Sequence, residues 1–149
     1  MGPLSAFSTF NILGSGLTAN SLWMDVIAEN LANANTTVTP GGGPYRRQEV
    51  VMAAGSGGNG GASSFAGSLG AAMGVHVTAI VPDPSPFRVA YDPGAPGANA
   101  QGYVQLPNVN PVVEMTDLVV ASQSFDANVS ALSVAESTTQ SALKIIQGV

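Results

Sequence analysis

The sequence predicts a mainly α protein with a small β part, in which long N- and C-terminal helices form an antiparallel coiled-coil-like hairpin beside a small β-rich middle domain. Near both ends of the 149 residues, apolar side chains recur at alternating spacings of three and four, whereas residues 36–110 are rich in Gly, Pro and Asn. Charged residues make up only 9% of the chain, against about 25% in an average globular protein. So few charges give little repulsion between copies, and we therefore expect a protein that assembles with other chains. We divide the chain into segments 1–35, 36–110 and 111–149.

The N-terminal segment is predicted to be a helix from about Ser5 to Asn35, with no proline inside it. A heptad pattern of this length is typical of a helix that packs along its length against another helix. Asn20 is the polar member of the pattern, and a single Asn in such a seam specifies register and partner number. A curved core helix of a globular domain is the alternative. The pattern consists of Phe10, Leu13, Leu17, Asn20, Met24, Ile27, Leu31 and Ala34.

The C-terminal segment is predicted to be a second helix from Pro111, which suits a first helical position, to a stop at Gly148. Glu114 and Asp117 complement the positive end of the helix dipole, and Lys144 complements the negative end. The pattern consists of Met115, Leu118, Ser122, Phe125, Val129, Leu132, Glu136, Thr139, Leu143 and Ile146. Glu136 must reach water or a donor from another chain, because an unpaired buried carboxylate is costly.

Both predicted helices are too long for the middle segment to cover, at 1.5 Å per residue. We therefore expect them to pack on each other and on other chains. If they form an antiparallel hairpin, facing residue numbers add up to roughly 147, within about one heptad. The predicted subunit-packing residues are Phe10, Leu13, Leu17, Asn20, Met24, Ile27, Leu31, Met115, Leu118, Phe125, Val129, Leu132, Leu143 and Ile146.

The middle segment carries short β-rich runs bounded by turn residues, which predict strands. They lie at residues 48–52, 75–81, 87–91 and 103–106, and Asp92-Pro93-Gly94 predicts a turn. These strands suffice for a small sheet or two hairpins. The Gly-rich run over residues 53–74 cannot bury enough apolar surface to order itself, so we expect a mobile loop.

The composition argues against catalysis, cofactors and metal sites. The chain has no cysteine, and His76, its only histidine, lies in an alternating strand-like run; thiol chemistry, a histidine-based zinc site and a Ser–His–Asp triad therefore lack support. The GSGGNG run at residues 55–60 lacks the strand and helix that a nucleotide-binding loop needs. Glu114 and three aspartates are interpreted as turn and cap residues, namely Asp83, Asp92 and Asp117.

Charge and hydropathy exclude two further partner classes. Four basic residues against nine acidic ones give a net charge of −5, which disfavours nucleic acid, since phosphate binding needs clustered Lys and Arg. No apolar run approaches the roughly 18 residues of a membrane span. The N-terminus lacks the basic and apolar regions of a cleaved secretory signal. We therefore expect no nucleic-acid partner and no membrane insertion. Together with the absence of catalytic and cofactor motifs noted above, the sequence also predicts no small-molecule substrate.

The run SGLTANSLWMDVIAENLANANTTVTPGGGPYRRQEVV over residues 15–51 resembles the N-terminal pattern of flagellar basal-body rod proteins. The runs at residues 42–48, 77–98 and 102–129 are similar to the proximal rod members of that family. The likeness covers nearly the whole chain in the same order and departs at residues 53–74. The matching residues of the pattern are Gly16, Leu17, Thr18, Ala19, Met24, Val26, Asn30, Leu31, Ala32, Asn33, Asn35 and Thr36.

The resemblance implies a structural subunit of the rod, the helical shaft that crosses the periplasm and transmits torque. It implies an inner layer of terminal helices and an outer middle domain, with copies of itself, other rod proteins and the basal-body base as partners. It also implies export by the flagellar type III apparatus without a cleaved signal. Another axial or adaptor protein with the same N-terminal pattern is the alternative, and a periplasmic enzyme is the alternative from a different class.

Overall fold

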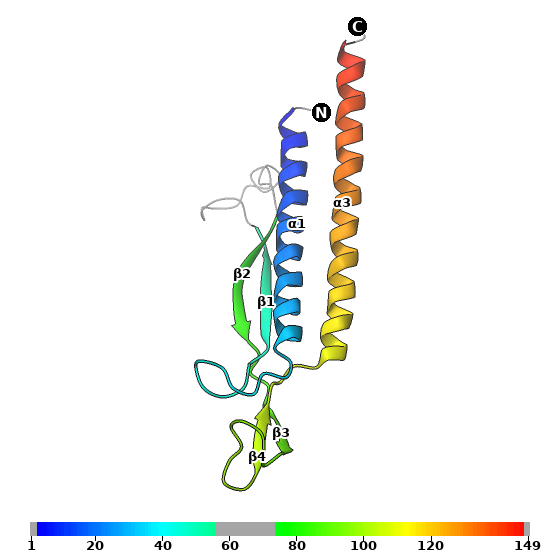
Figure 1. Ribbon diagram of the computed structural model, residues 1–149. Coiled ribbons are helices and arrows are strands. Elements are labelled where there is room, and N and C mark those ends of the chain that lie inside the picture. Colours follow the sequence, from blue (N-terminus) through cyan, green and yellow to red (C-terminus); the bar gives the residue numbers. More distant parts are fainter. Residues whose placement is uncertain (1–2, 56–73, 148–149) are drawn as a thin grey trace, which may run out of the picture. The chain divides into compact units, whose positions relative to one another are not determined.

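The computed structural model describes residues 3–55 and 74–147 (Figure 1). It confirms two long helices around a small β part. The elements are α1 (Pro3–Ala32), β1 (Gln48–Ala54), β2 (Val75–Pro82), β3 (Arg88–Tyr91), β4 (Tyr103–Leu106) and α3 (Pro111–Gln147). The predicted Gly-rich loop begins later than expected, because Ala53 and Ala54 still belong to β1. Residues 56–73 of that loop lie outside the described residues.

The described chain divides into two compact units, and each contains parts of both helices and of the β1–β2 pair. The first unit comprises residues 1–22, 52–78 and 122–149, and the second comprises residues 23–51 and 79–121. The division predicted from the sequence groups residues by secondary structure, into helix, middle domain and helix. The two compact units instead group residues that contact one another in space. The three-part division stays a prediction.

The strands form two separate two-stranded sheets, which was one of the two arrangements expected from the sequence. In the first sheet, β1 and β2 run antiparallel: the amide of Gly55 donates to the carbonyl of Gly74 (2.5 Å), and the amide of Asp83 donates to the carbonyl of Arg47 (2.8 Å). In the second sheet, β3 pairs antiparallel with β4, Arg88 opposite Leu106. Both sheets are too small to build a core of their own.

In the first unit, α1 contacts the β1–β2 pair on one side and α3 on another. The Ser15 hydroxyl donates to the carbonyl of Ile12 (2.7 Å) and accepts from the amide of Val75 (3.0 Å). A methyl group on Gly16 would lie only 3.1 Å from Nδ2 of Asn128. Gly16 therefore lets α3 approach closely.

In the second unit, Asn30 near the C-terminal end of α1 connects to both neighbours. Its amide Nδ2 donates to the carbonyl of Gln48 in β1 (2.9 Å) and to Oε2 of Glu114 in α3 (3.0 Å). The residue numbers of the pairs Gly16/Asn128 and Asn30/Glu114 both add up to 144. The helices therefore pair in opposite directions, and the facing numbers fall within the expected range.

The covered side of α3 repeats every seven residues and is called here the inner face of α3. Its members are all buried or half-buried: Glu114, Leu118, Ala121, Phe125, Asn128, Leu132, Ala135 and Thr139. The pattern predicted from the sequence shares Leu118, Phe125, Leu132 and Thr139 with this face. Its other members over that stretch are exposed, namely Met115, Ser122, Val129 and Glu136. The covered positions are thus small or polar residues that lie one place earlier in the chain.

The β3–β4 pair is closed by a turn that requires glycine. Asp92 accepts from the amide of Gly94 (3.1 Å), which confirms the predicted Asp-Pro-Gly turn. Gly102 has a φ of +82°, and a methyl group there would lie 2.8 Å from Cε2 of Tyr91. The rings of Tyr91 and Tyr103 pack edge to face with centroids 5.3 Å apart.

Candidate assembly site

A buried polar network holds the second unit together, and the side chain of Asn30 is at its centre. Asn30 is fully buried. Besides its two donated bonds, its Oδ1 accepts from the Tyr45 hydroxyl (3.0 Å) and from the amide of Gln48 (2.8 Å). An asparagine amide offers two donors and two acceptor sites. Asn30 therefore makes all four of its hydrogen bonds, and these join α1, β1 and α3.

Glu114 is the acidic member of this network, and its position corrects the prediction of a cap residue. Its side chain is fully buried. Oε1 accepts from Nε of Arg47 (2.5 Å), and Oε2 accepts from Asn30. Removing one partner of a buried ion pair costs about 3–5 kcal/mol, because it leaves an uncompensated charge. Glu114 therefore fixes the start of α3 to α1 and to the segment before β1.

Arg47 carries the positive charge of the network and is shared among four carboxylates. Besides Glu114, its guanidinium contacts Glu49, Asp83 (3.6 Å) and Asp117 (3.5 Å). Its backbone amide donates to Oδ1 of Asn108 (2.8 Å). Burial by itself would lower the pKa of Arg47, but the hydrogen bonds and charges of Glu114 and Glu49 raise the pKa above its usual value.

Two further groups near the network have shifted pKa values. Burial, together with the charges of Glu29 and Glu114, raises the pKa of the Tyr45 hydroxyl to about 12. Hydrogen bonds from Ser85 hold the pKa of Asp83 below its usual value, and the charge of Arg47 adds to this effect. The bond from the Ser85 amide to Oδ1 of Asp83 (2.7 Å) confirms Asp83 as a turn residue.

The other arginines also bind within the chain and are not grouped for a phosphate ligand. Arg46 donates to the carbonyls of Asp83 (2.7 Å) and Ser85 (3.1 Å) and lies over the ring of Phe87. Arg88 donates to the carbonyls of Pro107 and Val109 (both 3.4 Å). Arg46 thus binds the connection between β2 and β3, and Arg88 binds the connection between β4 and α3.

The helix surfaces carry the predicted subunit-packing residues. On α1, Ile27 is buried and the other predicted members are half-buried, namely Phe10, Leu13, Leu17, Asn20, Met24 and Leu31. On α3, Leu118, Phe125 and Leu132 are half-buried on the inner face. Met115, Val129 and Leu143 are 54%, 44% and 51% exposed. The side chain of Ile146 lies outside the described residues.

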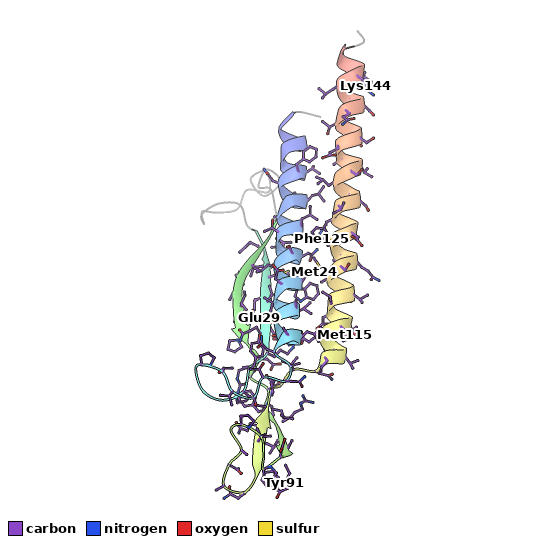
Figure 2. The ribbon with its side chains drawn as sticks, in the orientation of Figure 1. Met24, Glu29, Tyr91, Met115, Phe125 and Lys144 are labelled. Atoms are coloured by element: carbon purple, nitrogen blue, oxygen red, sulfur yellow. The ribbon has the colours of Figure 1, made fainter. Side chains whose placement is uncertain are left out.

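Exposed apolar side chains continue along α3 away from its inner face. Val112, Val119, Val134 and Ile145 are between 56% and 71% exposed. These residues are spread over most of α3 (Pro111–Gln147), and Figure 2 labels Met115 in its first turns and Lys144 in its last turns. Exposed polar residues such as Gln123, Asp126 and Ser130 lie between these apolar residues. Exposed apolar side chains that gather on a protein surface mark interaction sites. This surface of α3 is the candidate assembly site.

Two features of residues 3–55 and 74–147 bear on other functions. Among these residues, no three acidic or histidine side chains are grouped so that they could hold a metal ion. No helix there is long and apolar enough to span a membrane.

Comparisons with known proteins identify the family. Residues 10–38 match the family model "Flagella basal body rod protein", and residues 100–145 match "Flagellar basal body rod FlgEFG protein C-terminal". The FlgC basal-body rod protein of Borreliella burgdorferi is 40% identical, over 97% of this chain and all of that protein. The chain belongs to the FlgC family of flagellar basal-body rod proteins. The Bacillus subtilis FlgC protein is 41% identical over 95% of this chain and 99% of its own length, and an Escherichia coli FlgC protein is 37% identical over 90% and 92%.

Membership of the FlgC family makes this chain a structural protein of the bacterial flagellar rod. The two matched regions contain much of α1 and most of α3, which are the elements joined by Asn30 and Glu114. The sequence pattern pointed to both helices but missed the network. Asn30 was noticed only as part of the family pattern, and its polar side chain gave no sign of complete burial.

Proposed function

We propose that this chain polymerises through its two terminal helices into the proximal rod, which crosses the periplasm and transmits torque to the hook. Its partners are copies of itself, other rod proteins, the basal-body base and the export apparatus. In this proposal the chain is exported through the flagellar type III apparatus without a cleaved signal and has no catalytic activity. FlgC family membership supports the rod assignment.

The observation that carries the proposal is the exposed apolar surface of α3. Met115, Val129 and Leu143 recur every fourteen residues on one side of the helix and are about half exposed in the single chain. Covering a Val, Leu or Met side chain completely stabilises an interface by about 1.5–3 kcal/mol. If these side chains pack on neighbouring subunits, each subunit added to the polymer gains this stabilisation.

The test is a carboxylate at Val129, with Val129→Thr as the matched control of the same shape. We expect Val129→Asp to leave the fold of the single chain and its export unchanged, because exposed substitutions usually change stability by less than about 0.5 kcal/mol. We expect it to prevent rod assembly, because burying an unpaired carboxylate costs several kcal/mol. Export is measured as secreted protein, and assembly as rods in purified basal bodies. Normal rods from Val129→Asp would contradict packing at this residue.

A further inference from the structure

The apolar side chains on the inner face of α3 do not by themselves fix the register of the two helices, that is, which residue of α1 lies opposite which residue of α3. The large side chains of this face, Leu118, Phe125 and Leu132, recur every seven residues, and its small ones, Ala121 and Ala135, are fourteen residues apart with Asn128 midway between them. Shifting α3 by one heptad would therefore bring a similar row of large side chains against α1. An apolar row with a regular repeat specifies register weakly, whereas one polar member specifies it strongly.

Two polar members of this face, Glu114 and Asn128, each contact a residue of α1. Glu114 meets Asn30, and Asn128 meets Gly16. The two contacts are fourteen residues apart on both helices, and each lies within one of the two compact units. Of the two, Glu114 depends more on its partners, because its side chain is fully buried and each of its oxygens needs a hydrogen-bond donor.

A shift of one heptad would break the bond between Asn30 and Glu114 and would move Glu114 away from Arg47, while Asn30 would keep its bonds to Gln48 and Tyr45. In one direction Asn30 would face Ala121, and in the other Glu114 would face Trp23. Each buried polar group that loses its hydrogen bonds costs about 1–3 kcal/mol, and a buried charge costs more. The penalty falls mainly on Glu114, whose buried carboxylate would lose its donors Asn30 and Arg47, whereas the apolar contacts would change little.

We propose that Asn30 and Glu114 are the specificity-determining residues for the register of the helix pair. Through this register they decide which α3 side chains are covered by α1 and which are left exposed, Met115 and Val129 among the latter. The inference concerns the single chain and does not depend on assembly into a rod. Its failure is therefore distinguishable from a failure of the proposed function.

Disulfide trapping in the purified full chain tests this proposal, because the sequence contains no cysteine. Thr9 and Ala135 occupy the same register as Gly16 and Asn128, since their numbers also add up to 144. Thr9→Cys with Ala135→Cys therefore probes the native register. Thr9→Cys with Ala142→Cys or with Asn128→Cys probes a shift of one heptad in either direction. Dilute protein keeps the crosslinks within one chain.

With Asn30 and Glu114 present, we expect the Thr9/Ala135 crosslink to exceed either shifted crosslink by about tenfold or more, as the penalty for unpartnered groups implies. The central variant combines Asn30→Leu with Glu114→Leu. Replacing both members removes both of the polar groups that a shift would separate; the Gln48 backbone and the Tyr45 hydroxyl also lose Asn30, which lowers the stability of the variant. We expect this variant to keep its helix content by circular dichroism and to reduce the excess to about twofold or less.

Glu114→Gln is the conservative control, because it keeps the shape and an acceptor for Asn30, and we expect it to retain the native crosslink. If the double leucine variant still crosslinks only at Thr9/Ala135, the register is set elsewhere, for example through Asn108 and Arg47, and the proposal is wrong. A double variant that loses its helix content without a shifted crosslink would show a stabilising role only. That result would also overturn the proposal.

Discussion

Gly14 and Gly16 lie two residues apart on α1 but differ in what a methyl group would meet. Nothing lies within 4 Å of a methyl on Gly14, whereas a methyl on Gly16 would press on Asn128. Replacing glycine with alanine inside a helix stabilises it by about 1 kcal/mol. We expect Gly14→Ala to give this full gain in the free energy of unfolding and Gly16→Ala to give less.

A double-mutant cycle isolates the contact between Gly16 and Asn128. In an Asn128→Ala background, we expect Gly16→Ala to give the same gain as Gly14→Ala, because the crowding atom is gone. Urea unfolding of the four variants measures these differences. Equal gains from both glycines in the native background would show that α3 does not approach Gly16 closely.

Glu114 and Asp117 both contact Arg47, yet their burial predicts different costs of removal. Glu114 is fully buried, while the Asp117 side chain is 33% exposed and lies 3.5 Å from the guanidinium. We expect Glu114→Ala to destabilise the chain by about 3–5 kcal/mol and Asp117→Ala by about 1 kcal/mol or less. Denaturant unfolding gives both values. Similar small losses from the two variants would mean that Glu114 is solvated rather than buried.

The pKa of Tyr45 predicts a loss of stability in alkali. The folded state raises this pKa from 10 to about 12, so the unfolded chain releases the phenolic proton first. The stabilisation is complete below pH 10 and is lost as the pH rises from 10 towards 12. We expect the tyrosinate absorbance near 295 nm to show a step near pH 12 that Tyr45→Phe removes. Persistence of that step in the variant would assign it to another tyrosine.

Among the elements, the connection between β3 and β4 contains two glycines with positive φ, Gly97 and Gly102. Gly102 combines a positive φ with close contact to the Tyr91 ring, whereas a methyl on Gly94 in the same turn region would be 3.6 Å from its nearest neighbour. A non-glycine residue at such a φ costs about 1–2 kcal/mol, and the contact adds to this. We expect Gly102→Ala to increase amide hydrogen exchange across residues 103–106, and Gly94→Ala to leave it nearly unchanged. Equal exchange in the two variants would argue against the strained turn.

The helices and strands could be predicted from the sequence because each has a clear local pattern. Pro111 begins α3, and the four β-rich runs became β1 to β4 with ends shifted by a few residues. The inner face of α3 was harder to predict. Hydropathy favoured Met115 and Val129, but the close approach of α1 requires small or well-partnered residues, so Ala121 and Asn128 are covered instead.

The buried network could not be predicted because its members are distant in sequence and individually ordinary. A glutamate in the first turn of a helix normally complements the dipole. Glu114 is buried only because Arg47, 67 residues earlier, supplies the positive charge. Likewise, the complete bonding of Asn30 depends on Tyr45, Gln48 and Glu114, which the fold brings together.

At the scale of the whole molecule, the low content of charged residues and the exposed apolar side chains indicate that neighbouring subunits cover part of the helix surfaces. Only 9% of the residues are charged, so few charged side chains have to lose their hydration when copies pack together. We expect Leu31→Asp to prevent rod assembly, because Leu31 belongs to the predicted subunit-packing residues. Under the proposed function, in which the chain is exported unfolded, the variant leaves export intact. Secretion and motility assays measure the two steps separately. Normal swimming of this variant would show that Leu31 is not in a buried seam.

Cryo-electron microscopy of purified basal bodies, with this subunit tagged, tests the assembly of the chain through its terminal helices most directly. We expect the tag on the rod, both helices in its inner layer, and the side chains of Met115, Val129 and Leu143 covered by neighbouring subunits. A rod in which these three side chains face solvent, or basal bodies without the tagged chain, would contradict the account.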